Sequence, residues 1–189
     1  MANRDPERRA CTKRRIMDAY WDLYAADPSH SVTVSAVVAR AGVHRSTFYE
    51  YFADADAVLL AIEDGLAELF ETESARALSN GGVDPAGIVR RVYVEHGNKL
   101  SLLLGDAGDP RFAKRVKGVL GPVAMGRLGL SGDPFAPYLV EFAVSGLIAA
   151  ASRWYERDCD LPPDEFGAGV QALLFSVMSQ VGAARRAEA

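Results

Sequence analysis

The sequence predicts an all-α fold in which a small three-helix head precedes a larger helical body. Apolar residues recur three and four positions apart through most of the chain, and this spacing gives a helix one apolar face. Glycines and prolines stand where these patterns stop, which marks the helix ends. With 189 residues, 49% hydrophobic and 24% charged, the chain can bury a substantial core in one or two domains.

The first helix is predicted from Thr12 onward, and Asp27-Pro28 ends it. Its aromatic residues are expected to pack against the backs of the next two helices rather than to stack on bases. The apolar stripe of this helix comprises Ile16, Ala19, Tyr20 and Leu23, widened by Trp21 and Tyr24.

Residues 33–52, TVSAVVARAGVHRSTFYEYF, predict two short helices joined by a tight turn. Thr33 is a natural N-cap, because its hydroxyl can accept a hydrogen bond from a backbone N–H at the helix start. Gly42 ends the first helix, where a left-handed backbone favours glycine. The apolar faces are formed by Val34, Val37, Val38 and Ala41 in the first helix and by Phe48 and Phe52 in the second.

Polar side chains open the second short helix, at His44, Arg45, Ser46 and Thr47. This arrangement is typical of a helix-turn-helix, whose second helix enters the DNA major groove by its N-terminal residues. An arginine can bond O6 and N7 of guanine, and Ser, Thr and His can reach other base edges or phosphates. An ordinary αα-hairpin with solvated polar residues is the alternative. The length of the match and the closing Thr-Phe-Tyr-Glu-Tyr-Phe run favour DNA binding.

Through its A-G-V-x-x-S-T-F-Y-x-Y-F core, the segment resembles the DNA-binding domain of TetR/AcrR-family transcriptional regulators. The resemblance is strong over about residues 12–62 and architectural beyond. It implies that Thr33 caps the second helix against a phosphate, that 44–49 is the recognition helix, and that Tyr49 and Tyr51 contact the DNA backbone. Members usually carry a lysine just after the Tyr-x-Tyr-Phe run, whereas this chain has Ala55 between two aspartates. One phosphate contact expected of the family is therefore missing.

The charge is divided unevenly along the chain, whose net charge is −4. Residues 1–52 hold eight Lys/Arg against six Asp/Glu, and residues 53–189 hold thirteen against nineteen. A locally basic head on an acidic body suits site-specific DNA contact rather than general coating of nucleic acid. The basic residues among the first fifteen predict either a solvated, disordered terminus or a flexible arm along phosphates or in the minor groove.

Five further helices are predicted after the head, which we bound at 1–53, with the body at 54–189. Asp54 caps a long helix that Asn80-Gly81-Gly82 ends, and Asp84-Pro85 opens the next. Pro110 opens a helix through Leu120, and Pro122 kinks or splits it. The helix that Asp54 caps is predicted at about 54–79, and the last two long helices are predicted at about 135–157 and 163–183.

By resemblance to the family, the body is an effector-binding and dimerisation domain. Residues 84–157 would enclose a pocket for an unknown small molecule, with the large or polar candidates Tyr93, His96, Phe112, Met125, Phe142 and Trp154. For His96, a satisfied core histidine is the alternative. Small residues let helices approach closely, so the last two helices are expected to pair in a homodimer, with packing inside one chain as the alternative. The candidate interface residues are Ala143, Gly146, Ala150, Gly169, Ala172 and Ser176.

Other classes of protein are disfavoured. The start has no apolar signal segment, and the longest weakly polar run is too short to span a bilayer, so we expect a cytoplasmic protein without membrane contact. The three histidines and two cysteines lack metal-binding spacing, and we expect no metal, no cofactor and no catalytic residue. Cys11 and Cys159 are expected to be reduced thiols, and a redox switch would need a depressed thiol pKa.

The sequence therefore predicts a non-enzymatic transcription regulator that binds a double-stranded DNA operator, most simply a repressor released by a small molecule. The rival hypothesis is a small-molecule binder or helical enzyme whose head holds a partner protein. The polar opening of the recognition helix argues against that rival, because protein docking would not require it.

Overall fold

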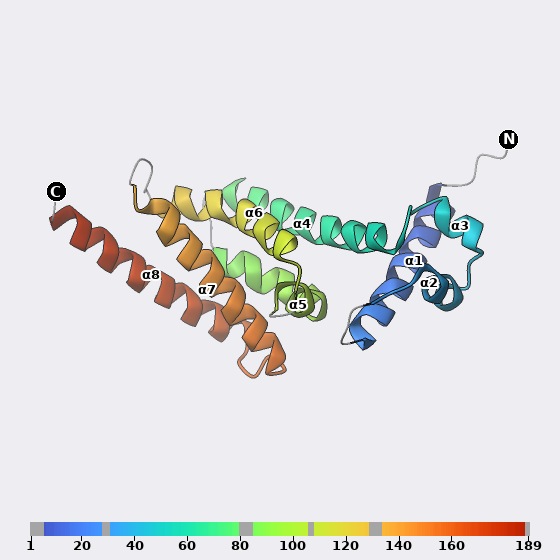
Figure 1. The fold of residues 1–189 in the computed structure, drawn as a ribbon. Coiled ribbons are helices and arrows are strands. Elements are labelled where there is room, and N and C mark those ends of the chain that lie inside the picture. Colours follow the sequence, from blue (N-terminus) through green and yellow to red (C-terminus); the bar gives the residue numbers. More distant parts are fainter. Residues whose placement is uncertain (1–5, 28–30, 80–84, 106–107, 129–133, 188–189) are drawn as a thin grey trace. The chain divides into compact units, whose positions relative to one another are not determined.

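In the computed structural model, residues 6–27, 31–79, 85–105, 108–128 and 134–187 are described, and the regular elements within these ranges are all α-helices, as predicted (Figure 1). The chain divides into two compact units, which meet inside one helix between Leu66 and Ala67. From here on we call them the head, which ends at Leu66, and the body, which begins at Ala67, whereas the boundary predicted from the sequence is at residues 53–54.

The head contains α1 (Pro6–Ala26), α2 (Val34–Ala41), α3 (Arg45–Tyr49) and the first part of α4 (Ala55–Ser79). Helix α2 packs against both α1 and α3. The predicted aromatic stripe of α1 faces inward: Tyr20, Trp21 and Tyr24 are each at most 6% exposed. Burial raises the pKa of Tyr20, with further contributions from Tyr24, Asp56 and Glu63. These aromatic rings belong to the core and are not available to bases.

The prediction for the start of α1 was wrong, because the helix begins at Pro6 rather than at Thr12. Residues 6–15, expected as a disordered terminus or flexible arm, are helical. The physical reason lies in the residues themselves: proline suits the first helical position, and Arg, Glu, Ala and Lys are good helix formers. Glu7 adds an acidic residue in the first turn, where the helix dipole favours it.

Helix α4 begins in the head and ends in the body, as one continuous helix of 25 residues. The predicted cap is confirmed: the Ala57 N–H donates to Asp54 Oδ1 over 2.7 Å. The predicted helix stop at residues 80–82 and the predicted cap at Asp84 lie outside the described residues.

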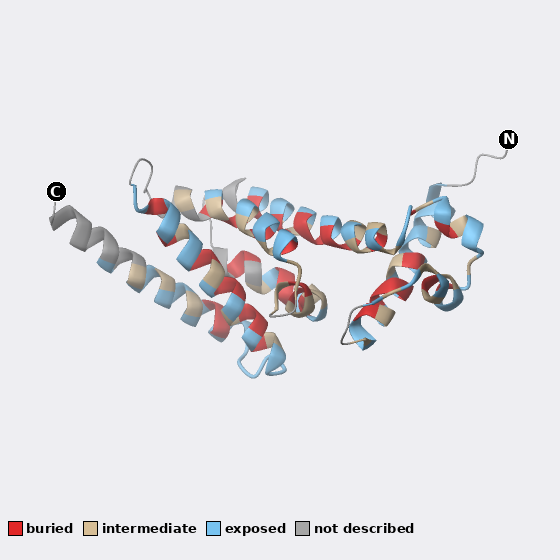
Figure 2. Ribbon diagram, in the orientation of Figure 1, coloured by how far each residue is buried: buried red, intermediate tan, exposed pale blue. Residues whose placement is uncertain are grey.

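In the body, α7 (Ala136–Glu156) packs against α5 (Pro85–Leu104), α6 (Pro110–Leu128) and α8 (Pro163–Ala187). Figure 2 shows buried residues running along the inner side of α7. The buried residues of α7 recur at helical spacing and include Leu139, Ala143, Leu147, Ile148, Ala151 and Trp154. This burial of a long apolar stripe holds the body together.

Of the two predicted effects of Pro122, a kink or a split, the split is wrong, because α6 continues through this residue to Leu128. Proline removes one backbone hydrogen bond and crowds the carbonyl of the residue four positions earlier. That residue is Gly118, and Leu120 and Val123 are buried on either side of the proline. Burial of these two neighbours opposes a break at this point. Of the predicted loop at residues 105–109, the described residues Gly105, Gly108 and Asp109 are not helical, whereas most of the loop predicted at 129–134 lies outside the described residues.

Helix α5 is kinked at His96, whose backbone angles, φ −129° and ψ 18°, are not helical. The next residue, Gly97, lies directly against the ring of Tyr155 on α7. A Cβ atom at Gly97 would overlap Tyr155 Cδ2, well inside van der Waals contact. Gly146 on α7 is the opposite case, since a Cβ atom there meets no atom of the described residues within 4 Å.

Within the described ranges, none of the helices combines the length and the hydrophobicity that crossing a membrane would require.

Candidate functional site

The turn between α2 and α3 has the geometry that the sequence predicts. Thr33 Oγ1 accepts a hydrogen bond from the Ala36 N–H over 3.3 Å and so caps α2. Gly42 adopts the left-handed conformation, with φ 61° and ψ 40°, and its N–H bonds back to α2. His44 then occupies the N-cap position of α3. These local signals fix the angle at which α3 leaves α2.

Helix α3 is five residues long, and Phe48 is its buried residue, at 0% exposure. The Phe48 ring meets the Tyr49 ring edge-on, with ring centres 5.5 Å apart, and the centre of the Phe52 ring lies 6.0 Å from that of Phe48. A helix this short has little stability of its own. Its position in the head therefore depends on Phe48.

Arg45 is already held by two side chains on the surface of the head. Its guanidinium donates to Tyr49 Oη over 3.2 Å and to Ser35 Oγ over 3.4 Å. The guanidinium carbon also lies 5.7 Å from the centre of the Tyr49 ring. The contact with Ser35 connects α3 to α2, and sequence reasoning gave no signal for it.

The other predicted DNA-contacting residues are largely accessible in the head. His44, Arg45 and Ser46 are exposed, Tyr49 is 48% exposed, and Thr47 and Tyr51 are half-buried. Thr33 is exposed although its oxygen caps α2. The surface of α2–turn–α3 thus offers several donors and one guanidinium, the groups that read base edges and bind phosphates.

Of the predicted effector-binding residues, Tyr93 and Trp154 are packed within the body. Tyr93 is fully buried, and its hydroxyl bonds Ser152 Oγ at 2.8 Å; burial raises its pKa to about 12, although the Ser152 bond opposes this. Trp154 stacks on Phe166 with ring centres 4.6 Å apart and donates its indole N–H to the Leu161 carbonyl. Both polar groups are therefore satisfied within the protein.

The remaining effector candidates occupy different environments. Phe112 is 1% exposed and Met125 is half-buried. Phe142 is 62% exposed on α7, so within one protomer it lies on the surface rather than in an enclosed pocket. The sequence pattern identified α7 as apolar but could not tell its inner face from its outer one.

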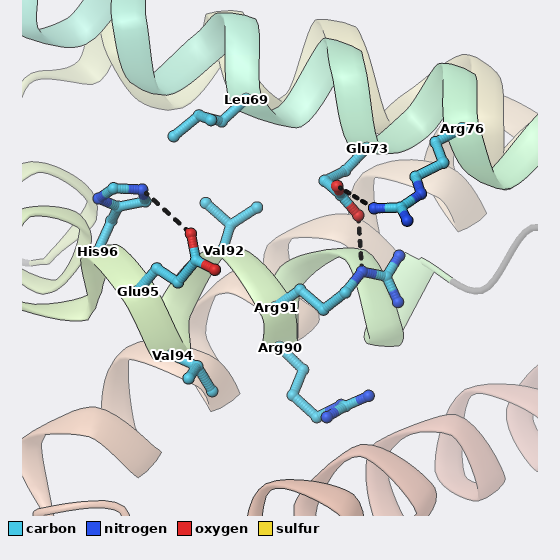
Figure 3. Close-up of a pocket in the computed structure, with 9 residues that line it drawn as sticks. All are labelled: Leu69, Glu73, Arg76, Arg90, Arg91, Val92, Val94, Glu95 and His96. Atoms are coloured by element: carbon cyan, nitrogen blue, oxygen red, sulfur yellow. Dashed lines mark hydrogen bonds and ion pairs between the residues drawn. The ribbon is translucent and has the colours of Figure 1, made fainter.

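His96 lines a pocket of about 240 Å³ between α4 and α5 (Figure 3). Glu73 extends from α4 and accepts a hydrogen bond from Arg91 Nε over 2.7 Å, while Arg76 Nη1 lies 3.6 Å away from it. His96 Nε2 lies 3.8 Å from Glu95 at the kink of α5. The lining residues are Leu69, Glu73, Arg76, Arg90, Arg91, Val92, Val94, Glu95 and His96.

The predicted dimer-interface residues divide into two groups. Gly146, Gly169, Ala172 and Ser176 are exposed, whereas Ala150 is half-buried and Ala143 is 7% exposed, with little surface to offer a partner. Large apolar side chains are exposed on the same two helices: Tyr138, Phe142, Leu173 and Phe175, at 62–74%.

Cys159 does not show the depressed thiol pKa that a redox switch would need. Both cysteines are exposed thiols. Partial desolvation, together with the charges of Asp158 and Asp160, raises the pKa of Cys159, which keeps this thiol protonated. Among the described residues, no three His, Cys, Asp or Glu side chains gather as metal ligands would.

Residues 16–62 match the family model of the bacterial regulatory proteins of the tetR family. The match covers the helix-turn-helix and the start of α4, where the sequence resemblance is strong. No curated protein matches the chain.

Solved structures with the same fold cover nearly the whole chain. A TetR transcriptional regulator from Streptococcus agalactiae is 19% identical with a TM-score of 0.65, covering 89% of this chain and 96% of that one. The fatty acid degradation regulator FadR from Bacillus halodurans is 18% identical with a TM-score of 0.62, covering 92% and 96%. FadR from Bacillus subtilis, solved in complex with stearoyl-CoA, is 17% identical with a TM-score of 0.56, covering 85% and 96%.

Proposed function

Because residues 16–62 match the tetR family of bacterial regulatory proteins, we propose that this chain is a DNA-binding transcriptional regulator of that family, a repressor that a small-molecule effector releases from its operator. The TetR family is not a family of enzymes. The observation that carries the proposal is the exposed face of α3, where Arg45 stands among other donors on a helix anchored by Phe48.

In this proposal α3 lies in the major groove, with His44, Arg45, Ser46 and Thr47 near base edges and Thr33, Tyr49 and Tyr51 on phosphates. The region that contacts DNA corresponds to residues 1–53, and residues 54–189 bind the effector and the partner subunit. The exposed apolar side chains of α7 and α8 support a homodimer, since patches of this kind mark protein interfaces. A standard interface buries about 1,600 Å².

Selection of duplexes from a random pool by the purified full-length protein tests the proposal directly. A repressor enriches one motif, with two half-sites about one helical turn apart or a multiple of it. It also keeps its preference for that motif as salt rises, whereas non-specific binding collapses. A head that only docks a protein partner would enrich no motif, and this result would contradict the proposal.

Arg45→Ala is expected to weaken binding to the selected duplex by about 1–3 kcal/mol and to relax one base position. The reason is that the guanidinium can bond two acceptors of one guanine, which alanine cannot replace. Repeating the selection with the variant measures the loss of preference at that position. Arg45→Lys is the matched control, because it keeps the charge but loses the two-pronged geometry. An unchanged motif with Arg45→Ala would show that Arg45 does not read a base.

The effector is proposed to bind among the body helices and to act through α4. The continuous α4 supports this route, because its first residues follow the recognition helix α3 and its last turns belong to the body. The Glu73–Arg91 ion pair joins these last turns to α5 beside the pocket. A ligand shifts such an element only if it binds one of its positions more tightly than the other.

Effector and operator are expected to oppose each other by about 1–3 kcal/mol, and the linkage must be reciprocal. Stearoyl-CoA, present in the Bacillus subtilis FadR structure, is the first compound for a thermal-shift screen of effectors. Calorimetric titration of the effector that the screen identifies, with and without the selected duplex, measures the coupling. Free coenzyme A is the control for acyl thioesters. Equal effector affinity in both titrations would reduce the function to constitutive DNA binding.

A further inference from the structure

Two cations of α1 lie over the aromatic residues that follow the recognition helix α3. The Arg9 guanidinium carbon is 6.0 Å from the centre of the Tyr51 ring, and Lys13 Nζ is 5.9 Å from the centre of the Phe52 ring. Both cationic side chains are exposed. Because Tyr51 and Phe52 follow α3 after only Glu50, these charges lie beside the C-terminal end of α3.

The helical structure of residues 6–15 fixes where these charges point. Arg9 and Lys13 are four residues apart in α1 and therefore neighbours on one face. Attraction between a cation and an aromatic ring helps to hold each of them in place. The stretch from Pro6 to Arg15 carries five Lys or Arg against one Glu, so its potential attracts anions.

The start of α4 supplies no cation to the same region. Ala55 is its first residue, and the first Lys or Arg of α4 in the sequence is Arg76. Asp54 accepts the capping hydrogen bond, and Asp56 adds a second negative charge in the first turn. A duplex lying along α3 would thus meet carboxylates at the start of α4 and cations on α1.

We propose that Arg9 and Lys13, with the Tyr51 hydroxyl, form a DNA phosphate-binding site that replaces the cation missing at residue 55. The site binds the backbone at the edge of the sequence that α3 reads. It contributes affinity and orientation without base preference, because phosphates carry no sequence information. This inference rests on the proposed function and adds residues of α1 to the interface.

A salt titration of the full-length protein tests the site, using the duplex selected from the random pool and a scrambled duplex of equal composition. Each lost phosphate contact lowers the slope of log K against log salt by about 0.9. The double variant Arg9→Ala/Lys13→Ala is therefore expected to lose about 1.8 units of slope while it selects the same motif. Arg15→Ala is the matched control, since Arg15 is two residues beyond Lys13 and faces the opposite side of α1.

Two further variants separate this role from packing of the cations on the rings. Arg9→Lys/Lys13→Arg keeps both charges and is expected to keep the slope. Adding Ala55→Lys to the double alanine variant is expected to restore about 0.9 units. A double alanine variant that melts at a lower temperature but keeps the full slope would overturn the inference. A wild-type protein that does not prefer the selected duplex over the scrambled one would contradict the proposed function instead.

Discussion

Phe48→Ala is expected to destabilise the head by about 3–5 kcal/mol. The Phe48 side chain is fully buried and is the residue through which the five-residue α3 enters the core. Its removal leaves a cavity that a short helix cannot fill by itself. We therefore expect loss of DNA binding together with loss of stability. Urea unfolding followed by Trp21 fluorescence, in a Trp154→Phe background, reports on the head.

Leu60→Ala is the control for this variant, because Leu60 is a large apolar residue of the head that is 49% exposed. Its replacement is expected to change stability by less than about 0.5 kcal/mol. If Phe48→Ala lowered the free energy of unfolding no more than Leu60→Ala, contacts other than those of the Phe48 ring would hold α3 in the head.

Gly146→Leu is expected to separate the proposed dimer and to weaken operator binding by about 10²–10⁴-fold. A side chain there meets no described atom of its own protomer, so the fold tolerates it. In a dimer formed by α7 and α8, the same side chain would force the helices apart. Two half-sites would then be bound by independent protomers. Analytical ultracentrifugation at micromolar concentration measures the assembly, and circular dichroism checks the fold.

Gly118→Leu is the matched control, because Gly118 is also an exposed helical glycine with open space around it among the described residues. It is on α6, outside the proposed interface, so this variant is expected to remain dimeric. A Gly146→Leu protein that sediments like the wild type would place the interface elsewhere.

Helix ends were predictable where the signal is local. Thr33, Gly42 and Asp54 act through their own backbone or hydroxyl and carboxylate groups, and each is found in its expected role. The start of α1 at Pro6 does not follow from the charge of residues 6–15, and the signal for it is the helix propensity of Arg, Glu, Ala and Lys. The passage of α6 through Pro122 depends on burial around the proline, which sequence spacing does not reveal.

Contacts between elements were less accessible to sequence reasoning. The polar residues of α3 were predicted, but the hold of Ser35 on Arg45 depends on how α2 and α3 cross. The kink at His96 contains no proline and had no sequence signal. Phe142 is a large residue on an apolar helix, and only the packing of α7 shows that it faces outward.

The surroundings of Gly97 and Gly146 subject the two positions to different kinds of selection. At residue 97 the requirement comes from within the protomer, because a side chain there would overlap the Tyr155 ring in every folded molecule. Selection for soluble, folded protein alone is enough to keep glycine there. At residue 146 a single protomer accepts any small change, so under the proposed dimer only selection for gene regulation keeps the glycine. A library of variants screened for expression would thus retain glycine at residue 97 only, whereas a library screened for repression would retain glycine at both positions.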